Sequence, residues 1–137
     1  MTAEALLCRQ YLGWPADHPG LRFGSSFLVR NYLPRKEEPN IYYWYYATQV
    51  MHHMGGRRWE TWNAAMRDTL VEMQETEGHQ AGSWSPVGGA IGTHDTDVGG
   101  RLYMTALATC TLEVYYRHLP IYREIDVDRS AAQLSQK

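Results

Sequence analysis

Apolar residues recur every three or four positions in five segments of the chain, and this spacing predicts five helices. The segments cover about residues 3–12, 19–33, 40–54, 59–73 and 101–119. The fourth has the clearest pattern, because its charged residues fill the face opposite a regular apolar stripe. That stripe consists of Trp59, Trp62, Met66, Leu70 and Met73.

Glycine and proline residues mark the expected ends of these helices. Gly13 follows the first segment, and the pair Gly55-Gly56 follows the third. Pro34 and Pro120 close the second and fifth, because proline lacks the amide hydrogen that a continuing helix needs. Asn40 is a suitable N-cap for the third segment.

Helix character alternates along the chain. The second and fourth segments have one polar face, whereas the third and fifth are apolar nearly all round, which predicts outer helices wrapped around inner ones. A weak internal repeat supports this order, since Thr2, Thr48 and Thr105 occupy matching places in the first, third and fifth segments. We therefore expect an all-α domain of antiparallel helix pairs over residues 1–122, followed by a polar tail over 123–137.

Composition and charge narrow the functional classes. A chain of 137 residues with 44% hydrophobic residues is large enough for one domain with its own core. A net charge of -2 argues against nucleic acid as a partner, and the basic pairs Arg35-Lys36 and Arg57-Arg58 are interpreted as solvated helix ends. Cys8 and Cys110 are expected to be buried reduced thiols, although the sequence leaves a disulfide open.

The sequence also bears on location. No apolar stretch is long enough to span a bilayer, and residues 1–4 lack the basic start of a secretory signal. The compartment stays open, because a domain cut from a longer protein would lack its own signals.

Three stretches carry a resemblance to a known family. Leu70, Gln74 and Gly78 stand at intervals of four and are followed by Gly82-Ser83-Trp84. This segment resembles the Gln-Trp motif of squalene and oxidosqualene cyclases, although three residues here separate Gly78 from Gly82. Residues 99–107 and 43–49 are similar to the inner helices of the same family.

The resemblance implies a fold and a choice of functions. It implies an α/α toroid of the squalene-cyclase and protein-prenyltransferase type, here a partial toroid of about five helices. Proteins of unrelated activity share such folds, so we expect a non-catalytic scaffold or interaction module. The alternatives are part of a terpenoid cyclase and an isoprenoid- or lipid-binding domain.

The catalytic signatures of the family are incomplete in this chain. Cyclases protonate their substrate with the central aspartate of an Asp-x-Asp-Asp motif, and the nearest match is Asp95 and Asp97, with Val98 in place of the last aspartate. Asp95 and Asp97 are therefore the candidate catalytic residues, although such pairs are common in plain turns. No Asp-x-Cys zinc pair is present, and His79 and His94 beside these aspartates match no closed metal site. We expect neither a metal nor a cofactor.

Aromatic side chains are the remaining candidates for ligand contact. In cyclases such rings stabilise carbocations, and by this analogy Tyr43, Trp44, Tyr46, Trp84 and Tyr103 are candidate ligand-binding residues. Successive helical residues rotate by about 100°, so a run of consecutive aromatic residues cannot all face one cavity, and we favour core filling. The adjacent His52 and His53 cannot bind one ion together, and His118 suits the end of a helix.

A closed toroid needs about six helix pairs, because each repeat buries its inner face only against its neighbours. This chain provides fewer than three. An open arc exposes the apolar surface of inner helices, and such surface marks an interface. We therefore expect contact with further repeats of a longer chain or with another copy of this one.

Overall fold

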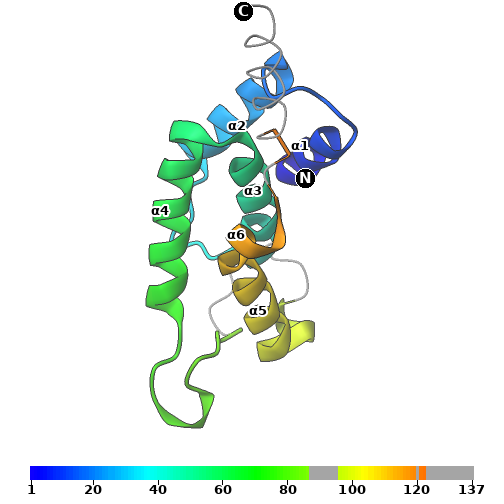
Figure 1. Ribbon diagram of the computed structural model, residues 1–137. Helices are drawn as coiled ribbons and strands as arrows, with labels where there is room; N and C mark the ends of the chain where they lie inside the picture. Colours follow the sequence, from blue (N-terminus) through cyan, green and yellow to red (C-terminus); the bar gives the residue numbers. More distant parts are fainter. Residues whose placement is uncertain (87–95, 120, 123–137) are drawn as a thin grey trace, which may run out of the picture.

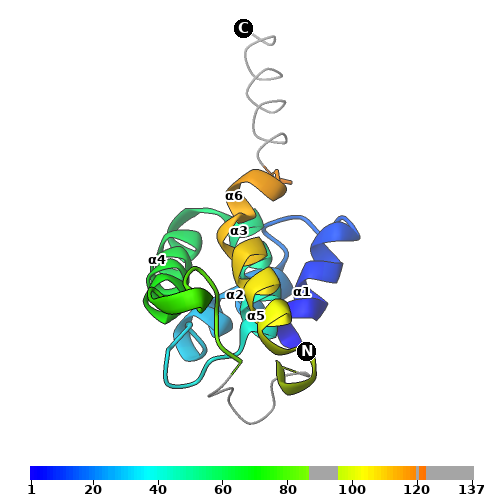
Figure 2. The same cartoon turned by 90° about the horizontal axis from the view of Figure 1, so that it is seen from below.

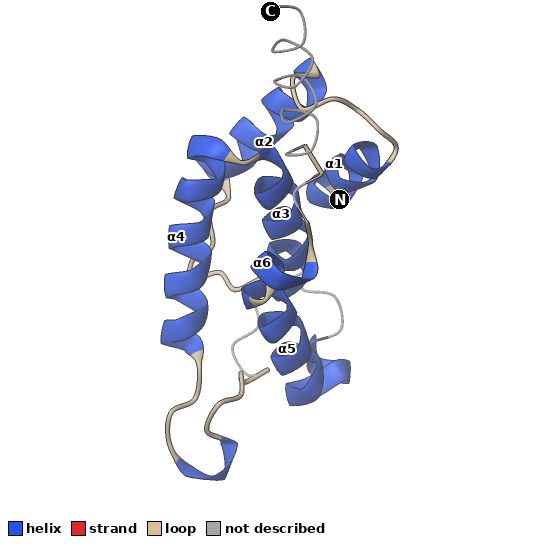
Figure 3. Ribbon diagram, in the orientation of Figure 1, coloured by secondary structure: helices blue, strands red, loops and turns tan. Residues whose placement is uncertain are grey.

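The computed structural model describes residues 1–86, 96–119 and 121–122, and the side chains of 96–98 are not among the described ones. Within this part every regular element is helical, which confirms the all-α prediction (Figures 1 and 3). None of these helices is both long and apolar enough to cross a membrane. The elements are α1 (Thr2–Tyr11), α2 (Pro19–Asn31), α3 (Ile41–Met54), α4 (Gly56–Met73), the 3-10 helix η1 (Gly78–Gln80), α5 (Thr96–Leu112) and α6 (Val114–Arg117).

The helix ends follow from local chemistry. Pro19 begins α2, and His18 Nδ1 accepts a hydrogen bond from the Gly20 amide at 3.1 Å. Asn40 caps α3 as predicted, since its Oδ1 accepts from the Tyr43 amide at 3.0 Å. Gly55, with a φ of 63°, is the single residue between α3 and α4, and only glycine adopts this conformation easily.

Helix α3 lies at the centre of the molecule. It contacts α1, α2, α4, α5 and α6, whereas α1 and α5 do not contact each other in the described part. In Figure 2, α1 and α4 lie on opposite sides of α3 and α5. Helices α1 and α5 thus pack on α3, while α2 and α4 also pack against each other.

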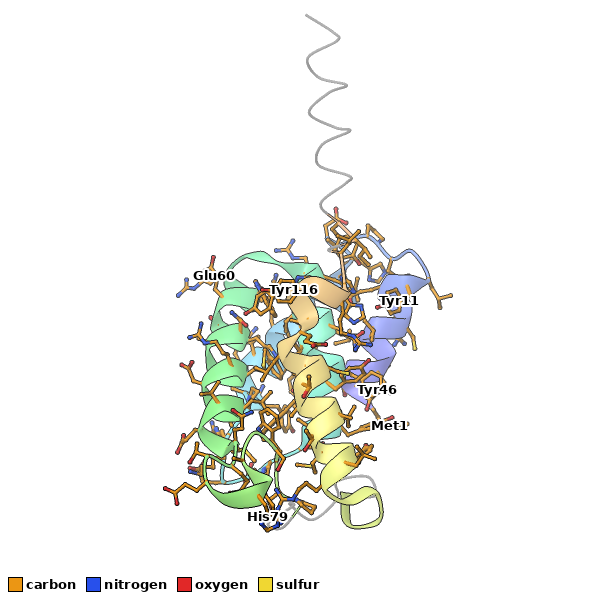
Figure 4. The ribbon with its side chains drawn as sticks, turned by 60° about the horizontal axis from the view of Figure 1, so that its bottom comes forward. Met1, Tyr11, Tyr46, Glu60, His79 and Tyr116 are labelled. Atoms are coloured by element: carbon orange, nitrogen blue, oxygen red, sulfur yellow. The ribbon has the colours of Figure 1, made fainter. Side chains whose placement is uncertain are left out.

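Helices α3, α4 and α5 alternate in direction. Helices α3 and α5 run one way, and α4 runs the other way (Figures 1 and 4). The pair α3–α4 is therefore antiparallel, as predicted from the sequence.

The core confirms the centre of the apolar stripe predicted for the fourth segment. From α4, Trp62, Met66 and Leu70 are buried as expected, and the Trp62 indole donates to Thr48 Oγ1 of α3 at 2.9 Å. Thr48 is itself buried, whereas Thr2 is exposed, so the repeated threonines do not share one environment. The buried residues of α3 are Ile41, Trp44, Ala47, Thr48, Gln49, Val50, Met51, His52 and His53.

Three predictions are wrong. The fifth helix ends at Leu112 rather than at about residue 119, and a kink at Gly100 (φ 59°, ψ -156°) separates it from a short helical segment that begins at Thr96. It is also not surrounded, because only one face packs on α3 and the opposite face is exposed. Cys8 is exposed rather than buried, and Cys110 is half-buried, with neither in a disulfide.

Candidate functional site

Most of the aromatic run of α3 belongs to the core. Trp44 is only 2% exposed. Tyr43 packs edge-on against Trp62, and its hydroxyl donates to the Tyr32 carbonyl at 3.1 Å. Burial raises the pKa of Tyr43 well above its usual range. These contacts give both residues a packing role.

Tyr46 lies on the side of α3 between α1 and α5 (Figure 4). Its ring meets that of Tyr42 edge-on, with centroids 4.8 Å apart. A hydrogen bond with Tyr42, and then burial, raises the pKa of Tyr46 to about 12. Tyr46 is half-buried, so of the candidates on α3 it retains more exposure than Trp44.

The segment that resembles the Gln-Trp motif ties the end of α4 to α5. The Trp84 indole donates to the Leu70 carbonyl at 2.8 Å, and its amide donates to Thr105 Oγ1 of α5 at 3.2 Å. Gln74, the C-cap of α4, donates to the Gly82 carbonyl at 3.0 Å. Trp84 is 4% exposed, so it satisfies one of the open carbonyls in the last turn of α4 from inside the core.

The remaining residues that the sequence suggested for ligand binding, catalysis or metal binding do not gather at one place in the described structure. Tyr103 is half-buried against the core. Asp95 lies outside the described residues, and Asp97 falls in the first turn of α5 with its side chain outside them. His94 lies outside as well, while His79 is exposed in η1. Within the described part no three His, Cys, Asp or Glu side chains gather as metal ligands do.

A histidine cluster was not predicted as a unit. His53 of α3 and His118, just after α6, have ring centroids 6.2 Å apart, and the Tyr11 hydroxyl of α1 lies 3.5 Å from His53 Nε2. Burial, then the neighbouring His52 and His118, lowers the pKa of His53 to about 4. Burial, and then Arg117, lowers the pKa of His118. The cluster is thus held neutral near pH 7, and no pattern in the sequence indicates that His118 packs near the pair in α3.

Helices α5 and α6 and the residues after them carry several large exposed apolar side chains. Met104, Ala108 and Thr111 are the buried face of α5. With about 100° of rotation per residue, Leu102 and Ala106 lie roughly half a turn away. Leu102 is 82% exposed. We define the α5 surface as Leu102, Ala106, Thr109, Tyr116 and Leu119, all of them exposed.

A second apolar surface lies at α1 and α2. The α1–α2 groove has a volume of about 450 Å³. Phe23 and Phe27 stack there with centroids 6.5 Å apart, and Phe23 is 73% exposed. Arg9 lies 5.1 Å from the centroid of the Trp14 ring at the same place. The lining consists of Thr2, Leu6, Arg9, Trp14, Gly20, Phe23, Gly24 and Phe27.

Comparison with known proteins adds no relative to this picture. No protein-family model, curated protein or solved structure matches the chain significantly.

Proposed function

We propose that this chain is a non-catalytic helical repeat module, of the squalene-cyclase and prenyltransferase type, that works by packing against another copy of itself. The observation that carries the proposal is the α5 surface, where Leu102, Tyr116 and Leu119 are each more than 80% exposed. Large apolar side chains that stay exposed on neighbouring elements mark a protein interface.

The order in which the helices pack side by side indicates where the second copy docks. Helix α3 packs on α1, and α5 packs on α3, so a further helix on the free side of α5 continues the same series. The α1–α2 groove lies at the other end of that series. We therefore propose a head-to-tail contact between the α5 surface of one copy and the α1–α2 groove of the next.

Charge supports this pairing. Glu113 is exposed at the junction of α5 and α6, between Thr109 and Tyr116 of the α5 surface in sequence, and Arg9 lines the α1–α2 groove. A carboxylate that approaches an arginine in a partly apolar groove favours one register of docking. Within the described part of the chain, Glu113 forms an exposed ion pair with Arg117 at 3.7 Å, and Arg9 of a neighbouring copy would compete with Arg117 for this carboxylate.

Leu102→Glu tests the proposal by native mass spectrometry and light scattering. The wild-type chain is expected to form dimers or larger species, and the variant is expected to weaken association at least about tenfold, because a charge replaces a desolvated apolar side chain. Val71→Glu is the matched control, since Val71 is 58% exposed on α4 and belongs to neither surface. A wild-type chain that stays monomeric at high concentration contradicts the proposal.

The second candidate function is lipid or isoprenoid binding in the α1–α2 groove. The specific observation in its favour is the mainly apolar lining contributed by Leu6, Trp14, Phe23 and Phe27. A monomer that carries a co-purified lipid, lost in Phe23→Ser, supports this candidate over self-association. The cyclase hypothesis gains no comparable support, because the side chains of Asp95 and Asp97 lie outside the described ones.

A further inference from the structure

A groove between α2 and the start of α4 gathers positive charge from two parts of the sequence. It has a volume of about 610 Å³ and is separate from both apolar surfaces. Arg30 of α2 joins Arg57 and Arg58 of α4 in its lining, and no Asp or Glu is part of that lining. The pair Arg57-Arg58, interpreted from the sequence as a solvated helix end, thus belongs to a cluster of three guanidinium groups.

The three arginines differ in how they are held. Arg58 Nε donates to Ser26 Oγ at 2.9 Å, which fixes this side chain between α4 and α2. Neither Arg30 nor Arg57 makes an ion pair or a hydrogen bond with another described side chain. The N–H donors of Arg30 and Arg57 are therefore available to a ligand, and they lie in the same groove as Arg58, which Ser26 holds in place.

The backbone at this end of the groove adds to the positive potential. No side chain caps the first turn of α4, whose first residues Gly56, Arg57 and Arg58 all line the groove. A Cβ built at Gly55 or Gly56 meets nothing within 4 Å, so the main chain here is open to a ligand. The first amides of an 18-residue helix carry a partial positive charge that favours an anion.

We infer that this groove binds a phosphate group carried by a small organic ligand. Guanidinium groups match phosphate oxygens in geometry as well as charge. The groove volume falls within the range of small-molecule sites, about 300–1,000 Å³, and exceeds what a phosphate alone fills. Val29 and Met54 supply an apolar wall for the rest of the ligand, and the hydroxyls of Ser26 and Thr61 supply polar contacts.

Isothermal titration calorimetry of the full chain with inorganic pyrophosphate tests the inference. Arg30→Gln and Arg57→Gln are each expected to weaken pyrophosphate binding about tenfold, since each removes a charged hydrogen-bond donor. Both side chains are exposed, so the fold should survive, and circular dichroism checks that it does. Arg35→Gln removes an exposed arginine that is not part of the groove and should leave binding unchanged.

A second arm identifies the source of the phosphate. Sedimentation with phosphatidylcholine vesicles that contain phosphatidic acid asks whether a lipid headgroup is bound. Binding of pyrophosphate in solution assigns a soluble ligand, and vesicle binding that needs Arg30 and Arg57 assigns a headgroup. The inference is overturned if neither probe binds, or if the Arg35 variant loses as much binding as the Arg30 and Arg57 variants.

Discussion

At the scale of single residues, burial decides the chemistry of the histidine cluster. His53 is 3% exposed and lies near His52, His118 and the Tyr11 hydroxyl. A proton on His53 is disfavoured because the charge loses its hydration and meets two neighbours that carry positive charge when protonated. The packing of α1, α3 and the segment after α6 thus depends on a neutral imidazole.

The resulting pH dependence has a definite sign. The pKa of His53 is about 4 in the folded chain against an ordinary 6.5, so between these values the unfolded chain binds more protons. Stability is therefore complete above about pH 6.5 and falls as the pH drops toward 4, by roughly 1–3 kcal/mol. Urea denaturation across this range measures the fall.

His53→Gln should remove most of the slope, whatever it does to the stability at neutral pH. His79→Gln, at an exposed histidine of η1, should keep the slope of the wild-type chain. An unchanged slope in the His53 variant means that the cluster does not titrate as described.

At the scale of elements, Trp84 couples the end of α4 to α5. Trp84→Phe removes the indole donor to the Leu70 carbonyl and leaves that buried acceptor without its partner. The expected loss is about 1–3 kcal/mol in the free energy of unfolding, measured by urea denaturation followed by circular dichroism.

Trp59→Phe is the comparison for this variant. Trp59 contacts His52 and Tyr115 through its ring, with centroids 5.1 and 5.4 Å away, and phenylalanine retains a ring there. Its loss should be smaller than that of Trp84→Phe. Equal losses argue that the hydrogen bond to Leu70 is not what joins the two helices.

The elements also show how far sequence reasoning reaches. The predicted stripe of α4 and the Asn40 cap of α3 are confirmed, because both depend on residues close together in the chain. An open arc was expected to expose apolar surface of an inner helix, but the apolar composition of α5 did not indicate which of its faces stays exposed, since burial depends on which helices are present to cover it. Likewise Arg30 and Arg57 line the same groove because α2 packs on α4, and this packing is not visible in the sequence.

At the scale of the whole molecule, the chain has two unequal ends. One end carries the α1–α2 groove with Phe23 and Phe27, and the other carries the α5 surface with Leu102 and Tyr116. Two different apolar surfaces on one chain favour a head-to-tail contact over a symmetric one, and such contacts close into rings or extend into chains. The central claim is therefore that the copies associate head to tail, through two different surfaces, and not merely that they form an oligomer.

Disulfide trapping tests this claim most directly. Thr2→Cys places a thiol in the α1–α2 groove and Ala106→Cys places one on the α5 surface, while Cys8→Ser and Cys110→Ser remove the two native thiols. Mild oxidation followed by mass spectrometry is expected to show a disulfide between position 2 of one chain and position 106 of the next. Species larger than dimers should accompany this link, and all of them should be lost when Thr2 is retained. Absence of the link, or a dimer joined through position 106 of both chains that persists when Thr2 is retained, contradicts the head-to-tail contact.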